Sequence, residues 1–132
     1  MQAGTIMCVE VIVKTRGELF PNWELNPVSA IMVVIHNEAA LLEIGPKSYS
    51  NVNYLLINKA ASGEFIPKDP KGTTIHEKIV AVDEIALMGR FIKVCLEHDP
   101  EIILGYETEI MSIGYLCKRA EKALNFKLND YL

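Results

Sequence analysis

The chain has 132 residues, half of them hydrophobic, and a formal net charge of -4 at neutral pH. This length suits one domain that buries roughly two thirds of its unfolded surface. No apolar run reaches the roughly 18 residues that cross a bilayer, and the first residues lack the basic start of a signal peptide, so we expect a soluble intracellular protein with no membrane contact. The acidic balance argues against autonomous binding to duplex nucleic acid, which relies on clustered lysines and arginines.

The cysteines and histidines give no metal or disulfide signature. The three cysteines are odd in number and far apart, so we expect reduced thiols packed as small apolar side chains. The three histidines are equally dispersed and lack the spacing of a zinc site. These residues are Cys8, Cys95, Cys117, His36, His76 and His98. We therefore expect no cofactor in this chain.

The first half of the chain predicts three strands. Residues 5–14 are rich in β-branched side chains and apolar on both faces, which favours a central strand. Residues 28–36 predict a second strand, antiparallel because the connection has no helical periodicity, and residues 53–58 predict a third. Glu10 interrupts the first run. Since an ionised carboxylate is seldom buried alone, we expect Glu10 at a strand surface, in an ion pair or in a functional site.

A loop and a helix are predicted next. Residues 59–75 contain several Pro and Gly breakers and predict a mobile, exposed loop. A short extended piece at 79–82 follows, and Asp83 is predicted to cap a helix that ends at Asp99–Pro100. We expect the apolar stripe of this helix to face the core. The stripe consists of Ile85, Met88, Phe91, Ile92 and Cys95.

The last part of the chain predicts a strand, a loop and a second helix. Residues 102–104 form an apolar run that suits a buried strand, and Ser112 has the chemistry of an N-cap. Since ligands gather at the carboxyl ends of strands in α/β proteins, we expect any chemistry in the loop at 105–111. The apolar face of the helix would hold Ile113, Leu116, Ala120 and Leu124. Its solvated face would hold Lys118, Arg119 and Lys122, and Lys127 would lie in solvent just after the helix.

This last stretch is similar to the second exonuclease motif of family-B DNA polymerases. That motif opens with Asp-Pro-Asp, continues through Gly-Tyr-Asn to a Phe-Asp pair, and closes with Tyr-Leu and Arg-Ala. In this sequence Glu107 stands at the Asn position, and the metal-binding Asp falls on Ser112. The residues that fit the motif are Asp99, Pro100, Gly105, Tyr106, Tyr115, Leu116, Arg119 and Ala120.

A second match to the same family lies near the start of the chain. The family's exonuclease domain begins with a strand that bears Asp-x-Glu, and a Pro-x-Pro-x-x-Asp-Pro-Val segment opens the next strand. Here residues 7–13 occupy the first strand, and residues 21–28 correspond to the later segment. The Asp of the strand motif falls on Glu10, and its Glu falls on Ile12.

The resemblance implies a fold and a parent protein. The fold is α/β and ribonuclease-H-like (3′–5′ exonuclease-like): a mixed sheet with flanking helices, truncated before its last elements, in a single degenerate domain segment at 1–132. The implied parent is a nuclear, translesion, DNA-directed DNA polymerase. It would bind DNA and accessory polymerase subunits, and it would hold magnesium and an iron–sulfur cluster outside this chain. The segment itself would have a structural or interaction role.

The resemblance also indicates where a metal site would lie. Glu10, Ile12 and Ser112 stand at the family's ligand positions, and the Asp of the third motif falls outside the chain. Two divalent ions need several converging carboxylate oxygens, which an isoleucine and a serine do not supply. We therefore expect no catalytic residue, no bound metal and no proofreading here.

Two other interpretations stay open. Glu10 with Glu107 or Glu109 would hold a single divalent ion and give a weak nuclease. Alternatively, the chain is a stand-alone protein-interaction module derived from this fold. Because loss of the last strand and helix would expose a sheet edge, self-association is also expected.

Overall fold

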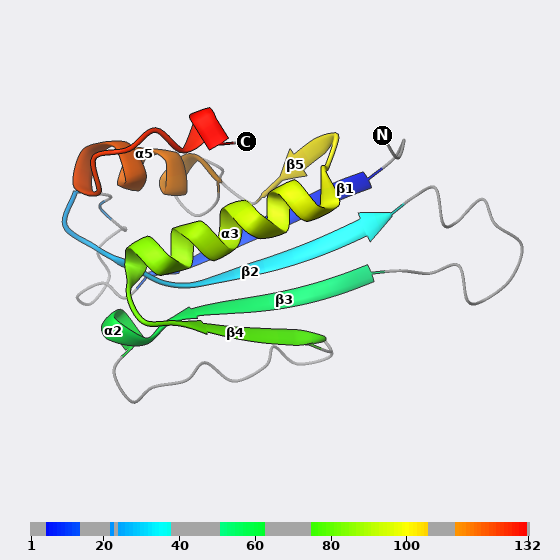
Figure 1. The fold of residues 1–132 in the computed structure, drawn as a ribbon, viewed down its shortest axis with the longest axis horizontal. Helices are drawn as coiled ribbons and strands as arrows, with labels where there is room; N and C mark the ends of the chain where they lie inside the picture. The colour runs from blue at the N-terminus through cyan, green and yellow to red at the C-terminus, as the bar shows by residue number, and fades with distance from the viewer. Residues whose placement is uncertain are drawn as a thin grey trace, which may run out of the picture.

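In the part of the chain that the structure describes, five strands form one mixed sheet in the order β4-β3-β2-β1-β5 (Figure 1). The computed structural model describes residues 5–13, 22, 24–37, 51–62, 75–105 and 113–131. No helix in these ranges is long and apolar enough to cross a membrane. The two longest helices, α3 (Glu84–His98) and α5 (Ile113–Ala123), pack on the same face of the sheet.

The strands combine an antiparallel meander with parallel additions at both edges. The meander consists of β1 (Thr5–Val13), β2 (Val28–Asn37) and β3 (Asn51–Asn58). At one edge β4 (Glu77–Ala81) runs parallel to β3, and at the other β5 (Ile102–Leu104) runs parallel to β1. This topology confirms the α/β class and fits a ribonuclease-H-like exonuclease fold.

Local sequence signals set the ends of α3. The Asp83 side chain accepts a hydrogen bond from the Ala86 backbone N–H over 2.8 Å, which satisfies an otherwise unpaired donor of the first turn. At the other end Asp99 adopts a left-handed conformation with φ 45°, and its N–H donates to the Cys95 carbonyl. Pro100 follows at once and prevents continuation. Both predicted ends of the helix are confirmed.

Two shorter helices complete the described elements. A short helix, α2 (Lys59–Ser62), begins directly after β3, and the 3-10 helix η2 (Leu128–Tyr131) follows α5. The predicted mobile loop at 59–75 therefore opens with a helical turn. Residues 63–74 lie outside the described residues.

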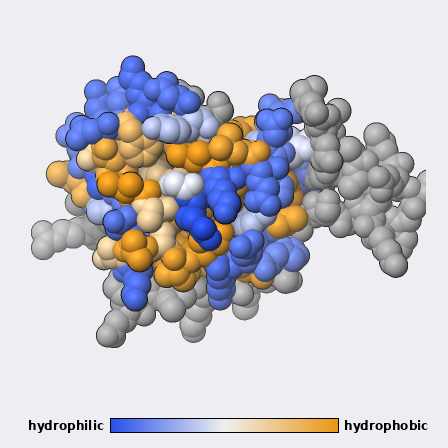
Figure 2. Space-filling view, in the orientation of Figure 1, coloured by the Kyte–Doolittle hydropathy of each residue, from blue (hydrophilic) through white to orange (hydrophobic). Residues whose placement is uncertain are grey.

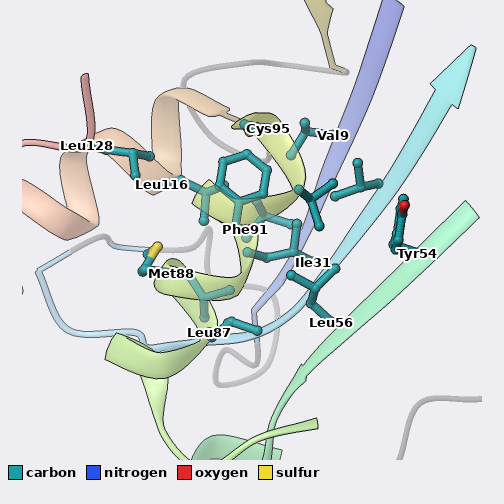
Figure 3. Close-up of a cluster of buried hydrophobic side chains, with 14 of the residues drawn as sticks. Val9, Ile31, Tyr54, Leu56, Leu87, Met88, Phe91, Cys95, Leu116 and Leu128 are labelled. Atoms are coloured by element: carbon teal, nitrogen blue, oxygen red, sulfur yellow. The ribbon is translucent and has the colours of Figure 1, made fainter. Parts of the chain in front are cut away.

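The core lies between the sheet and the two helices (Figure 3). Phe91 of α3 and Leu116 of α5 are fully buried against the odd-numbered residues of β1. The predicted stripe of α3 is partly wrong, because Ile85 is 62 % exposed. The helix is rotated so that Leu87 and Val94 face the sheet instead. The residues of α3 buried with them are Glu84, Met88, Phe91 and Cys95.

The far face of the sheet is less completely covered. Alternate residues of β1 are buried toward α3, whereas Ile6, Cys8 and Glu10 on the other side are half-buried. The strand is thus central in its pairing, as predicted, but not apolar and buried on both faces. The prediction of a buried strand at 102–104 is also wrong. Strand β5 is an edge strand whose Ile102 and Leu104 are each 49 % exposed.

Candidate functional site

The ligand positions of the first motif lie on the far face of β1, at the carboxyl end of two parallel strands. Cys8 is paired with Leu104, the last residue of β5. Glu10 is the next residue on the same face of β1, so it lies just beyond the end of β5, where Gly105 leads the chain away. This is the strand end at which α/β proteins gather ligands.

The immediate strand neighbours of this position are apolar. Met32 of β2 is paired with Glu10, and Ala30 is paired with Ile12. Ile12 is 39 % exposed, so this apolar side chain is partly accessible at the position where the family motif has a glutamate. A hydrocarbon side chain offers no lone pair to a cation. The site therefore lacks one oxygen donor on β1 itself.

The second-motif positions are described only in part. Helix α5 begins at Ile113, immediately after Ser112, as expected from the predicted cap. Ser112 itself, and the loop residues Glu107 and Glu109, lie outside the described residues. The alternative interpretation, in which Glu107 or Glu109 joins Glu10, therefore concerns residues outside the described ones and stays open.

The described donors do not fit a two-metal centre. Within the ranges that the structure describes, no group of three or more His, Cys, Asp or Glu side chains lies close enough to hold a metal ion. Two divalent ions acting together need several carboxylate oxygens around one point. Of the two first-motif positions, Glu10 alone supplies a carboxylate, so we derive no metal-dependent step for this chain.

A buried ion pair that the sequence did not predict lies under α5. Arg119 donates to both carboxylate oxygens of Glu84, through Nε and Nη2, each over 2.9 Å. Both side chains belong to residues only 8 % exposed, and the Val28 backbone N–H donates to the same carboxylate over 2.8 Å. The expected solvated position of Arg119 is therefore wrong. Lys118, Lys122 and Lys127 are exposed, as predicted.

The same arginine and a neighbouring tyrosine hold the segment that leads into β2. Arg119 Nη1 donates to the Glu24 carbonyl over 3.1 Å, and the Tyr115 hydroxyl donates to the Asn26 carbonyl over 2.7 Å. Burial raises the pKa of Tyr115 to about 12, although the Arg119 charge lowers it. We call Glu84, Tyr115 and Arg119 the anchoring cluster. Two of its members, Tyr115 and Arg119, are residues that fit the second motif. The closing Arg-Ala of that motif was the one sequence feature that marked Arg119 as more than a solvated side chain.

Two of the three cysteines have thiols whose burial disfavours the reactive thiolate form. None of the three forms a disulfide, and Cys95 is buried with its thiol 3.8 Å from the Met7 sulfur. Burial raises the pKa of the Cys95 thiol to about 12 and also raises the pKa of Cys117. A thiol with a raised pKa is a poor nucleophile at neutral pH. The prediction of buried thiols is confirmed for Cys95 and is wrong for Cys8 and Cys117, which are only half-buried.

Comparison with known proteins agrees with this arrangement. Residues 3–131 match the family model described as DNA polymerase family B, exonuclease domain. The chain is 30% identical over 125 residues to the DNA polymerase zeta catalytic subunit of Mus musculus and to that of Homo sapiens. It is 27% identical over 119 residues to the Arabidopsis thaliana protein of the same name.

These alignments cover 90–91% of this chain but only 4–6% of the relatives. The chain therefore spans a small part of the length of the proteins that it matches. Because the family model covers almost every residue and the sheet has the expected topology, the chain belongs to the exonuclease-domain family of family-B DNA polymerases.

Proposed function

We propose that this chain is a catalytically silent exonuclease-like domain of a translesion DNA polymerase, with a structural and interaction role and no proofreading. The observation that carries the proposal is Ile12, a partly exposed hydrocarbon side chain at a metal-ligand position beside Glu10. A single carboxylate on β1 leaves two divalent ions without enough negative charge to hold them.

The anchoring cluster supports a structural role for this chain. Its hydrogen bonds join the first turn of α3, the middle of α5 and the start of β2. These bonds fix the scaffold without involving Glu10 or Ile12. The fold can therefore persist while the nuclease chemistry is absent.

The relatives suggest the wider setting. The relatives are named DNA polymerase zeta catalytic subunit, and a DNA polymerase acts on DNA. We therefore propose that the parent of this chain acts on DNA and is located in the nucleus. Accessory polymerase subunits, magnesium and an iron–sulfur cluster would belong to other regions of the parent. The half-exposed Ile102 and Leu104 of edge strand β5 would support self-association.

A nuclease assay tests the proposal. The chain is incubated with 5′-labelled single-stranded DNA and either Mg²⁺ or Mn²⁺, and products are resolved on a sequencing gel. We expect no shortening of the DNA above a metal-free control. The Glu10→Ala variant is the matched control, because it removes the one first-motif carboxylate. Cleavage by the unmodified chain that Glu10→Ala abolishes would establish the alternative, a weak single-metal nuclease.

A further inference from the structure

A histidine side chain takes part in the pairing of β3 with β4, at the end of the sheet where both strands begin (Figure 1). The Asn53 backbone N–H donates to His76 Nδ1 over 2.9 Å, and the His76 backbone N–H donates to the Asn53 carbonyl over 2.9 Å. The regular parallel register begins one residue later, with Tyr54 opposite Glu77. The imidazole ring therefore accepts a bond that a backbone carbonyl accepts in a regular ladder.

This bond exists in only one protonation state of His76. A backbone N–H can only donate, so Nδ1 must carry a lone pair and the ring proton must lie on Nε2. A protonated imidazole ring carries N–H groups at both nitrogens and has no acceptor. Gain of a proton would set two donors against each other and remove the bond. Histidine is the side chain that ordinarily changes its charge between about pH 5 and pH 8.

The hydrogen bond of a second histidine does not depend on charge in this way. His98 Nε2 lies 2.7 Å from the hydroxyl of Tyr54, the residue that follows Asn53. A hydroxyl can both donate and accept, so it donates to a neutral ring and accepts from a protonated one. Only the contact of His76 is therefore lost on protonation, although the two rings bind neighbouring residues of β3.

The start of β4 relies on its backbone contacts with β3. Residues 76–78 are exposed, and the apolar contacts on either side of them are made by the partly buried Ile75 and the buried Ile79. In the described part of the chain, β4 is an edge strand that pairs with β3 alone. Loss of the bond to His76 would therefore loosen this end of the strand before it affects the core.

Charged and titratable groups lie on both faces of the sheet near the ring. By strand alternation, Lys78 of β4 and His36 of β2 lie on the same face as His76. Glu77 lies on the other face, towards α3, and Figure 2 shows this side of the molecule, where hydrophilic and hydrophobic side chains adjoin. The charged residues of α3 beside Glu77 are Arg90, Lys93 and Glu97. A variant that changes the ring and none of these charges is therefore the cleanest test.

We propose that His76 is a proton-sensitive latch on the pairing of β3 with β4. The neutral ring holds the start of β4 on β3, and the protonated ring releases the Asn53 N–H to solvent. The ladder from Tyr54 onward stays formed, because its bonds join backbone groups that do not titrate. The latch goes beyond the proposed function, since it uses none of the metal-ligand positions and operates whether or not Glu10 binds an ion.

NMR of the ¹⁵N-labelled chain tests the latch. At about pH 7.5 we expect a nitrogen–nitrogen coupling across the hydrogen bond between the Asn53 amide and His76 Nδ1, and this coupling should vanish at about pH 5. Over the same interval the hydrogen-exchange protection of the Asn53 amide, corrected for the intrinsic exchange rate, should fall about fivefold or more. The Leu55 amide, within the regular ladder, should change by less than about twofold.

Three variants assign the response to the ring. His76→Asn places an amide oxygen where Nδ1 lies, so the Asn53 amide should stay protected at both pH values. The variants His36→Gln and His98→Gln remove the other two histidines in turn and should leave the response unchanged. His76 is exposed, so its replacement should leave the fold intact. The proposal would be overturned by absence of the coupling at about pH 7.5, by protection of Asn53 that ignores pH, or by a response that persists in His76→Asn.

Discussion

The anchoring cluster under α5 and the first-motif ligand positions on β1 differ in whether the side chains present supply the polar groups that each arrangement requires. The Glu84 carboxylate accepts three hydrogen bonds, one from Val28 and two from Arg119. On the other face of the sheet, Ile12 has no donor or acceptor to offer at a position where metal chemistry needs oxygen. The proposal of a catalytically silent domain implies that the scaffold of a nuclease and its reaction chemistry are separable, because folding requires only the first.

The largest expected effect is loss of the buried ion pair. Arg119→Met should lower the free energy of unfolding by about 3–5 kcal/mol, because it leaves the buried Glu84 carboxylate without its cation. Urea denaturation followed by circular dichroism measures the change. The matched variant on the other face, Glu10→Gln, should change the free energy of unfolding by less than about 1 kcal/mol. Equal losses in the two variants would contradict the distinction between the regions.

A smaller difference should appear between the two faces of β1. Met7 is fully buried beside Cys95, whereas Ile12 is partly exposed on the other side. Met7→Ala should lower the free energy of unfolding by about 2–5 kcal/mol. Ile12→Ala should lower it by less than about 1 kcal/mol. If Ile12→Ala were the more damaging change, β1 would be packed on both faces, as its sequence alone predicted.

The smallest expected effect is a pH dependence at the anchoring cluster. Burial raises the pKa of Tyr115 from 10.0 to about 12, despite the opposing effect of Arg119. A raised pKa in the folded chain stabilises it fully below pH 10 and loses this contribution as the pH rises toward 12. The unfolding free energies of the unmodified chain and Tyr115→Phe should therefore converge over this interval. A constant difference between them would show that the Tyr115 hydroxyl titrates equally in both states.

Features determined by neighbouring residues were predictable from the sequence. Asp83 and Asp99–Pro100 fixed the ends of α3 because caps and proline act on the backbone within a few residues. The rotation of that helix was not predictable in detail. Apolar residues occur on more than one side of it, and only packing against the sheet buries Leu87 and exposes Ile85.

Features that depend on distant parts of the chain could not be predicted. The pairing of Glu84 with Arg119 joins residues 35 positions apart, and an arginine within a helix usually lies in water. Similarly, the apolar run of β5 gave no sign that the strand lies at a sheet edge. At the candidate site, the resemblance to the family motif was needed to place Glu10 and Ile12 at ligand positions, and the structure added their position at the strand end.

Manganese binding tests the central claim, that the scaffold is present without a two-metal site, most directly. Isothermal titration of the chain with Mn²⁺ is compared with the variant Ile12→Glu/Ser112→Asp, which places carboxylates at both altered ligand positions. We predict no saturable binding in the micromolar range for the unmodified chain and a gain of binding in the variant. Micromolar binding of two ions by the unmodified chain, lost in Glu10→Gln, would contradict the account.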